Sequence, residues 1–272
     1  MRSRSLDAFF SPASIAVIGA SDRRDSVGGA VLANLRHAEF AGPVYAINRQ
    51  HAEIQGQRAY SSLQDLPEVP QLAVLCTAAA TIPELIADCG QAGVKAAVVI
   101  SAGFRETGAE GRALERRLMA SLHASPGLRL IGPNCLGILR PSQRINASFS
   151  AVMPRAGRVT LLSQSGALGT AIMDWANQRE IGFAACVSVG NMVDVGMAEL
   201  IEYFADDPET DAILLYLEGL ADADGFIAAA QACTARKPVI AYKSGRFEES
   251  SRAAASHTGA MATSDAVYDA AF

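Results

Sequence analysis

One histidine of the chain has neighbours that suit chemistry other than metal binding. His257 lies in the stretch RAAASHTGAMATSDA, where it is surrounded by alanine, serine, threonine and glycine. Metal ligands occur in spaced sets of His, Cys, Asp and Glu, and no such set is close to it in sequence. The small neighbours leave the imidazole accessible. His257 is therefore either an ordinary loop histidine or a nucleophile.

A carboxylate that can orient this imidazole follows a predicted strand. Glu218 comes directly after the apolar run of DAILLYLEGL. Functional groups of parallel sheets gather at the carboxyl ends of the strands, so we expect Glu218 to lie near His257. A carboxylate in that position fixes the tautomer of an imidazole and stabilises its cation.

The stretch VTLLSQSGALGTAIMDWA predicts a strand, a polar turn and a helix. Free N–H groups and the positive end of the helix dipole attract an anion to such a turn. Ser165 is equally a simple helix N-cap, and the turn lacks the glycine that precedes a hydrolase serine by two residues. Together with His257 and Glu218, the turn predicts a site that holds a phosphoryl group on histidine. The turn residues are Ser163, Gln164, Ser165 and Gly166.

A second polar loop follows the run IAVIGA and leads into a helix, as phosphate-binding loops do. A long insert separates Gly19 from Gly28, so the GxGxxG spacing is absent. The next strand ends in Asn48 instead of Asp or Glu, which disfavours NAD. The glycines can alternatively serve only the close approach of helix and strand. Nearby arginines suit a ligand with more phosphate charge; they are Arg23, Arg24 and Arg49.

Two further strand ends carry polar turns in the same half of the chain. VISAGF supplies Ser101, Ala102 and Gly103, and IGPNCLG supplies Asn134. Ligands of open α/β sheets bind outside the carboxyl ends of the strands, so we expect these turns beside the first loop. Asn134 can bond a ligand amide or base, or it can simply form a turn.

Apolar runs of strand length alternate with alanine-rich amphipathic segments along the chain. This alternation predicts repeated βαβ units, and hence an α/β fold with two tandem doubly wound parallel-sheet domains. The first domain is predicted over residues 1–147 and the second over residues 148–272. Helices are expected near residues 166–178, 196–206 and 222–235. The stretch 133–157 reads as the connection between the domains.

Composition excludes several classes of function. The chain has 272 residues, half of them hydrophobic, and a net charge of −5, which provides no basic surface for nucleic acid. No apolar run is long enough for a signal peptide or a membrane span. Five scattered cysteines suit reduced thiols, so we expect a cytoplasmic protein without a metal site. The large apolar share favours an oligomer. The final SDAVYDAAF starts like an amphipathic helix, which indicates a domain truncated at its C-terminus.

Eight stretches occur in the order of one known family: SIAVIGAS, ISAGF, IGPNCLG, LLSQSGALGTAIMDWA, SVGN, LLYLEG, KPVIAYKSGR and AAASHTGAMA. In these stretches the chain resembles the NDP-forming acyl-CoA synthetases, typified by ADP-forming acetyl-CoA synthetase. More distantly it is similar to the α subunit of succinyl-CoA synthetase. The resemblance implies a Rossmann-like CoA-binding domain followed by a flavodoxin-like, succinyl-CoA-synthetase-type ligase domain.

The resemblance also implies an activity and a role for each site residue. The reaction is acyl-CoA + ADP + phosphate ⇌ carboxylic acid + ATP + CoA. His257 takes a phosphoryl group from an acyl phosphate, Glu218 supports the phosphohistidine, and the turn 163–166 holds its oxygens. ATP or ADP and Mg²⁺ bind an ATP-grasp β subunit or C-terminal domain. The acyl group and the choice between ADP and GDP stay open. CoA is contacted by Gly19, Ala20, Ser21, Ser26, Val27, Gly28, Asn48, Ser101, Ala102, Gly103 and Asn134.

Two other functions compete with this one. Some protein lysine acetyltransferases carry a similar region as a CoA-sensing or acyl-CoA-sensing module, and LAVLCT, INASFS and DWANQREIGF resemble them. Their nucleophilic histidine is typically replaced, so the presence of His257 and Glu218 favours catalysis. An NAD-dependent oxidoreductase is a remote alternative, opposed by Asn48 and the broken glycine pattern.

Overall fold

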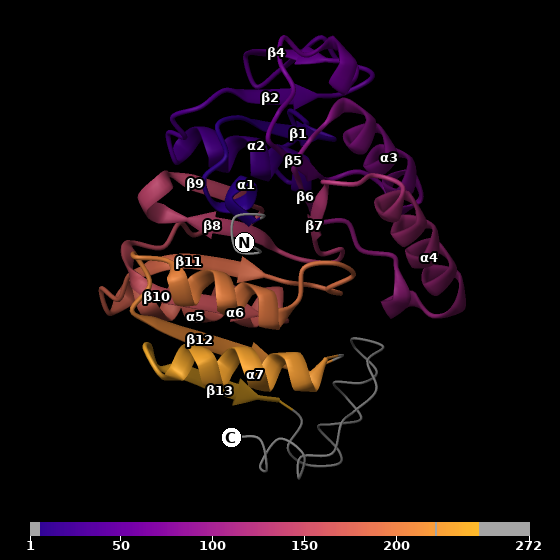
Figure 1. Cartoon of the computed structure of the whole chain (residues 1–272). Helices are drawn as coiled ribbons and strands as arrows, with labels where there is room; N and C mark the ends of the chain where they lie inside the picture. The colour runs from indigo at the N-terminus through magenta and orange to yellow at the C-terminus, as the bar shows by residue number, and fades with distance from the viewer. Residues whose placement is uncertain (1–5, 221, 245–272) are drawn as a thin grey trace.

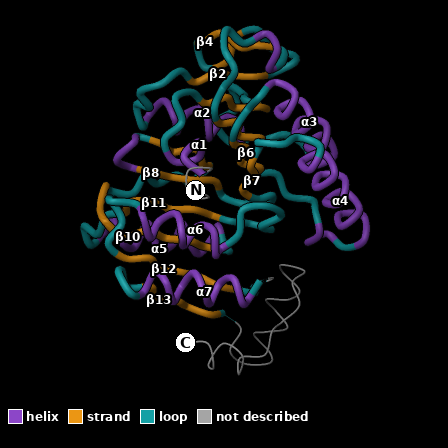
Figure 2. Tube along the Cα trace, in the orientation of Figure 1, coloured by secondary structure: helices purple, strands orange, loops and turns teal. Residues whose placement is uncertain are grey.

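The computed structural model describes residues 6–220 and 222–244. Within them the chain forms two β-sheets with helices on their faces (Figure 1), so the predicted α/β fold is confirmed. The tube in Figure 2 shows strands and helices alternating through both halves. No helix in these ranges is long and apolar enough to cross a membrane.

The first sheet has seven strands in the order β3-β4-β2-β1-β5-β6-β7. Its strands are parallel except for the β3–β4 hairpin. The central strand β1 is buried along its whole length, as expected for a parallel strand that is covered on both faces. The strands are β1 (Ile15–Ile18), β2 (Val44–Ile47), β3 (Glu53–Ile54), β4 (Gln57–Tyr60), β5 (Leu72–Leu75), β6 (Ala96–Val99) and β7 (Arg129–Ile131).

Four helices cover the two faces of this sheet. The helices α1 (Asp7–Phe10) and α2 (Val27–His37) pack with one set of β1 side chains. The helices α3 (Ile82–Ala92) and α4 (Ala109–His123) pack with the alternate set. Successive side chains of a strand point to opposite faces, so each face of β1 has its own hydrophobic cluster.

The second sheet has six strands in the order β13-β12-β10-β11-β8-β9. The four strands β10 to β13 are parallel, and β8 pairs antiparallel with both β11 and β9. The strands are β8 (Gly137–Arg140), β9 (Ile145–Ser148), β10 (Ala156–Ser163), β11 (Phe183–Ser188), β12 (Ala212–Leu217) and β13 (Val239–Lys243).

The three predicted helices of the second half are confirmed as α5 (Gly166–Gln178), α6 (Met197–Asp206) and α7 (Ala223–Thr234). Apolar residues of α5 pack against one face of the sheet. Those of α6 and α7 belong to the large cluster on the other face.

The stretch 133–157 is more than the connection that the sequence predicted. It contains β8, β9 and the start of β10, and the β8–β9 hairpin extends the edge of the second sheet. The sequence pattern did not predict these strands because they contain polar residues. Asn146 and Ser148 are nevertheless buried, and Ser148 Oγ donates a hydrogen bond to Asn146 Oδ1 at 2.6 Å. The domain boundary at residues 147/148 stays a prediction, although β8 and β9 join the second sheet.

Side chains from both halves hold the two sheets together. Arg129 of β7 pairs with Asp194 through Nε at 3.0 Å and with Glu199 of α6 through Nη1 at 2.7 Å. The short helix α1 also reaches the second half, where the rings of Phe10 and Phe204 lie 4.9 Å apart. Both aromatic rings are buried. These contacts hold the two halves in one arrangement, in which residues that follow strands of both sheets line one hollow.

Candidate functional site

Two hollows open at the carboxyl ends of the first sheet. The smaller, of 270 Å³, lies beside the end of β1 and is lined by Gly19, Asn48 and Arg49 among others. The larger, of 480 Å³, lies between the two halves. Thr77, which follows β5, lines both hollows and so marks where they meet.

The loop before α2 packs tightly on the end of β1. Ser26 is the N-cap of α2: its Oγ accepts a bond from Gly29 N at 3.1 Å and donates to Arg23 O at 2.6 Å. A Cβ on Gly28 would lie 1.9 Å from the carbonyl oxygen of Gly19. Glycine is therefore required here for the close approach of helix and strand. This packing role is one of the two interpretations of the glycines, and ligand binding is the other. The ligand role of this loop stays a prediction.

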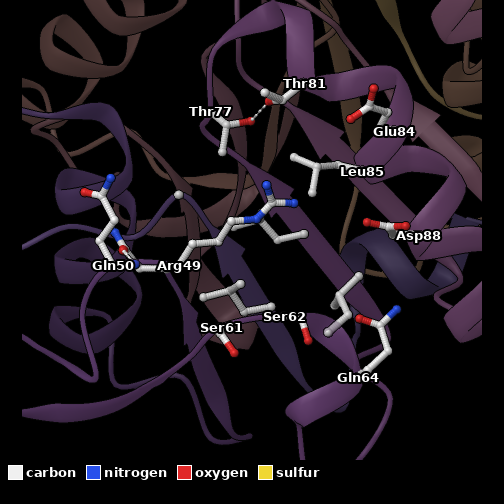
Figure 3. A pocket seen from close by; sticks show the side chains of 15 residues that line it. Arg49, Gln50, Ser61, Ser62, Gln64, Thr77, Thr81, Glu84, Leu85 and Asp88 are labelled. Atoms are coloured by element: carbon white, nitrogen blue, oxygen red, sulfur yellow. Dashed lines mark hydrogen bonds between the residues drawn. The ribbon is translucent and has the colours of Figure 1, made fainter.

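Asn48 ties the end of β2 to this loop. Its Nδ2 donates to Ala20 O at 2.8 Å, and its Oδ1 accepts from the backbone N–H groups of Gln50 at 2.8 Å and His51 at 3.2 Å. Asn48 also lines the smaller hollow, where Figure 3 shows Arg49 extending across toward Leu85 of α3. A cationic side chain at this place suits a phosphate-bearing ligand.

The turns after β6 and β7 meet in the larger hollow. Asn134 N donates to Ser101 O at 3.0 Å, and Ser101 Oγ donates to Thr77 O at 2.5 Å. Asn134 has a φ of 59°, a left-handed conformation that asparagine tolerates well. Ser101, Ala102 and Asn134 all line the cavity, as expected for neighbouring strand ends.

Glu106 fixes the turn 101–103, although no motif in the sequence singles it out. Its Oε1 accepts from Gly103 N at 2.6 Å and from Phe104 N at 3.0 Å, and its Oε2 accepts from Asn191 Nδ2 at 3.0 Å. Burial raises the pKa of Glu106, but these hydrogen bonds outweigh burial and hold the pKa below its usual value. The carboxylate is thus stably ionised while it holds the turn.

Asn191 links this turn to the second half of the chain. It is almost fully buried, its backbone N–H donates to Pro133 O at 2.8 Å, and its Oδ1 accepts from Asn134 Nδ2 at 3.4 Å. Its own Nδ2 also donates to Glu115 Oε2 at 2.8 Å. The polar end of the SVGN stretch after β11 was the available signal, but its partners lie far away in sequence.

Gln55, in the β3–β4 turn, clamps the loop before α2 and was also missed. Its Nε2 donates to Ser21 O at 3.0 Å and to Gly29 O at 2.9 Å, so one amide spans the loop. Its backbone N–H donates to Asp22 Oδ1 at 2.6 Å. Three bonds from a single residue therefore hold the loop in its observed shape.

If the loop before α2 contacts CoA, replacing Gln55 by alanine weakens CoA binding by up to about thirtyfold, because two hydrogen bonds of about 1 kcal/mol each no longer hold the loop. Titration calorimetry with CoA measures the change. The matched control is Gln178→Ala, since the Gln178 amide bonds Asp174 on the same helix at 3.3 Å. Equal affinities of the parent and both variants would show that the clamp does not serve binding.

The turn 163–166 is joined to the end of β12 by Gln164. Its Nε2 donates to Gly219 O at 2.6 Å, and its Oε1 accepts from the backbone N–H groups of Gly219 at 3.1 Å and Glu218. Ser163 Oγ donates to Ser165 O at 2.7 Å, and Ser165 caps α5 by accepting from Leu168 N at 3.3 Å. The structure therefore brings the predicted phosphate turn and Glu218 together.

The remaining predicted residues fall into two groups. Val27 and Gly166 line the larger hollow, facing the turns of the first half. Ala20, Ser21, Ser26, Gly28, Gly103, Ser163, Gln164 and Ser165 lie in the adjoining loops and line neither hollow. His257 lies outside the described residues, so its pairing with Glu218 stays a prediction. Among the described residues, no group of three or more His, Cys, Asp or Glu is placed to hold a metal ion.

Comparisons with known proteins match both halves of the chain. Residues 13–141 match the family described as CoA binding domain, and residues 156–272 match the succinyl-CoA ligase like flavodoxin domain. The acetate–CoA ligase (ADP-forming) II subunit alpha of Pyrococcus furiosus is 45% identical over 267 residues, covering 98% of this chain and 58% of that protein. Along nearly its whole length the chain is thus similar to the ADP-forming acetate–CoA ligases. Acetate–CoA ligase (ADP-forming) I of Archaeoglobus fulgidus is likewise 42% identical over 267 residues, covering 98% of this chain and 38% of that protein.

A solved synthetase has the same fold. The dinucleotide forming acetyl-coenzyme A synthetase 1 of Ca. Korarchaeum cryptofilum, in complex with phosphate and ADP, matches with a TM-score of 0.93 and 42% identity, over 98% of this chain and 57% of that one. The chain thus spans 38% to 58% of the length of these three synthetases. The acetyltransferase module and the NAD-dependent oxidoreductase gain no support from them.

Proposed function

We propose that this chain is the CoA-binding and phosphohistidine part of an ADP-forming acyl-CoA synthetase. One observation carries the proposal: Ser101, Ala102 and Asn134, assigned to CoA, line the same 480 Å³ cavity as Gly166 of the phosphate turn. An acyl group that passes between a thiol and a phosphate needs both partners in one space. The family match of both halves supports the same assignment.

In the proposed first step, phosphate lies at the N-terminus of α5, where the free N–H groups and the dipole hold its oxygens. A phosphate oxygen attacks the thioester carbonyl of the bound acyl-CoA. The new C–O bond forms, the C–S bond breaks, and CoA leaves as a thiolate that takes up a proton. The products are an acyl phosphate and CoA.

In the second step, the imidazole of His257 attacks the phosphorus of the acyl phosphate. The P–N bond forms, the P–O bond to the acyl group breaks, and the acid leaves as its carboxylate. The role proposed for Glu218 is to orient the imidazole and stabilise its developing positive charge. Gln164 supports this arrangement, because its side chain bonds the backbone of Glu218 and Gly219.

The third step requires a second unit. We propose that the phosphohistidine passes its phosphoryl group to ADP, bound with Mg²⁺ on an ATP-grasp β subunit or C-terminal domain. This chain spans 58% of a relative that is itself named a subunit, which supports a larger assembly. We further propose that the protein is an oligomer and that it lies in the cytoplasm. The free thiols of all five cysteines support this location.

The first two steps need no nucleotide, and this allows a direct test. The chain is incubated with ³²P-labelled phosphate and acetyl-, butyryl- or phenylacetyl-CoA. We expect acid-labile, base-stable labelling of His257 with at least one of these thioesters, mapped by mass spectrometry. Phosphate with CoA alone should leave the protein unlabelled. A chain that binds CoA but stays unlabelled with all three thioesters would contradict the phosphohistidine assignment.

A further inference from the structure

The larger cavity has an apolar wall whose purpose the fold alone does not explain. Two large hydrophobic side chains on it are substantially exposed, Val27 at 38% and Phe149 at 42%. Val27 begins α2, and Phe149 directly follows β9, so they come from different halves of the chain. Both forgo part of the hydrophobic stabilisation that burial would give.

Phe149 is exposed although its backbone is held on both sides. Asn34 of α2 donates from Nδ2 to Ser148 O and to Ser150 O, each at 2.8 Å. The N–H of Ser150 donates to Ser148 Oγ at 3.2 Å, and that of Phe149 to Leu136 O at 3.4 Å. The exposure of this ring is therefore built into the fold and is not the result of a loose loop.

The rest of the lining has no charge. Apart from Val27 and Phe149, the residues around the cavity are Cys76, Thr77, Ile100, Ser101, Ala102, Asn134, Cys135, Leu136, Gly166, Ala167 and Thr170. None of these described residues is acidic or basic. Only the N-terminus of α5 at Gly166 offers backbone N–H groups that can hold phosphate. Elsewhere along the described lining, a charged group would lose its water without gaining an ionic partner, which is unfavourable. The part of the cavity around Val27 and Phe149 therefore favours an uncharged, largely apolar occupant.

We infer that Phe149 and Val27 form the wall that contacts the acyl group of the acyl-CoA, which makes Phe149 a specificity-determining residue. The inference rests on the proposed function. The reacting carbonyl must lie between the CoA thiol and the phosphate turn, and both sets of residues line this cavity. The apolar part of the acyl group then lies against the Phe149 ring. Binding of the acyl group therefore buries the part of this ring that the fold leaves exposed.

The test measures how affinity depends on acyl length. The chain is titrated calorimetrically with CoA and with acetyl-, butyryl- and hexanoyl-CoA. In the parent, affinity rises with length by up to about fourfold for each buried methylene. In Phe149→Ala the ratio of hexanoyl-CoA to CoA affinity falls at least fivefold, whereas Phe149→Leu keeps most of it. The control is Trp175→Ala, because this ring is 51% exposed on α5 and does not line the cavity.

Each other outcome is decisive. If Phe149→Ala leaves the ratio of hexanoyl-CoA affinity to CoA affinity unchanged, Phe149 does not contact the acyl group. The same conclusion holds if the variant binds both ligands more weakly by the same factor. The proposed function then still stands, because CoA binds. If the parent binds neither CoA nor any acyl-CoA, the proposed function itself fails and the inference fails with it.

Discussion

The His257→Ala variant is expected to take up no phosphoryl group from phosphate and acyl-CoA. Alanine has no nitrogen to form the P–N bond, so the second step stops and net acid formation falls by about a thousandfold or more. The first step does not use this histidine. The acyl phosphate should therefore still form, and hydroxylamine should trap it as a hydroxamate in excess of the amount that acyl-CoA itself gives when phosphate is omitted.

The matched control is His123→Ala. His123 is an exposed residue in the last turn of α4, far in sequence from every predicted phosphate residue. This control should label like the parent. Labelling of His257→Ala at the rate of the parent would assign the nucleophile to another residue. Loss of the trapped hydroxamate as well would show that His257 acts before the acyl phosphate forms.

Much of the fold was predictable because parallel strands buried on both faces leave a simple pattern. The residues of β1 and β11 are all buried, and each strand is one apolar run in sequence. The start of α5 was readable because Ser165 has the side chain that caps a helix, and it does cap this one. Local chemistry decides these features, so a single sequence reveals them.

The hairpin β8–β9 was missed because its buried polar groups satisfy one another. Asn146 and Ser148 look like loop residues until their mutual bond is known. Gln55, Glu106 and Asn191 were missed for a related reason. The Nε2 of Gln55 donates to the carbonyl of Gly29, and Asn191 bonds Glu106, which lies 85 residues away in sequence. No periodic pattern in a sequence encodes such pairs.

Gly28→Ala is the second variant for which we expect a large effect. The added Cβ would lie 1.9 Å from the oxygen and 2.8 Å from the carbon of the Gly19 carbonyl. Both are backbone atoms, so no side chain can rotate to make room and α2 must move away from β1. We expect a loss of about 2–4 kcal/mol in the free energy of unfolding and a fall in Tm of about 5–10 °C. Calorimetric scanning measures both.

The same displacement should weaken CoA binding at least tenfold, because it moves the loop 19–29 and Val27 at the wall of the cavity. Gly196→Ala is the control, since among the described residues no heavy atom beyond its chain neighbours lies within 4 Å of the added Cβ at the N-cap of α6. A Gly28→Ala chain with the stability of the parent would mean that α2 is not packed on β1 as observed. A destabilised chain that binds CoA as tightly as the parent would separate the two roles of Gly28. It would show that Gly28 serves the packing of α2 on β1 and that the loop does not belong to the CoA site.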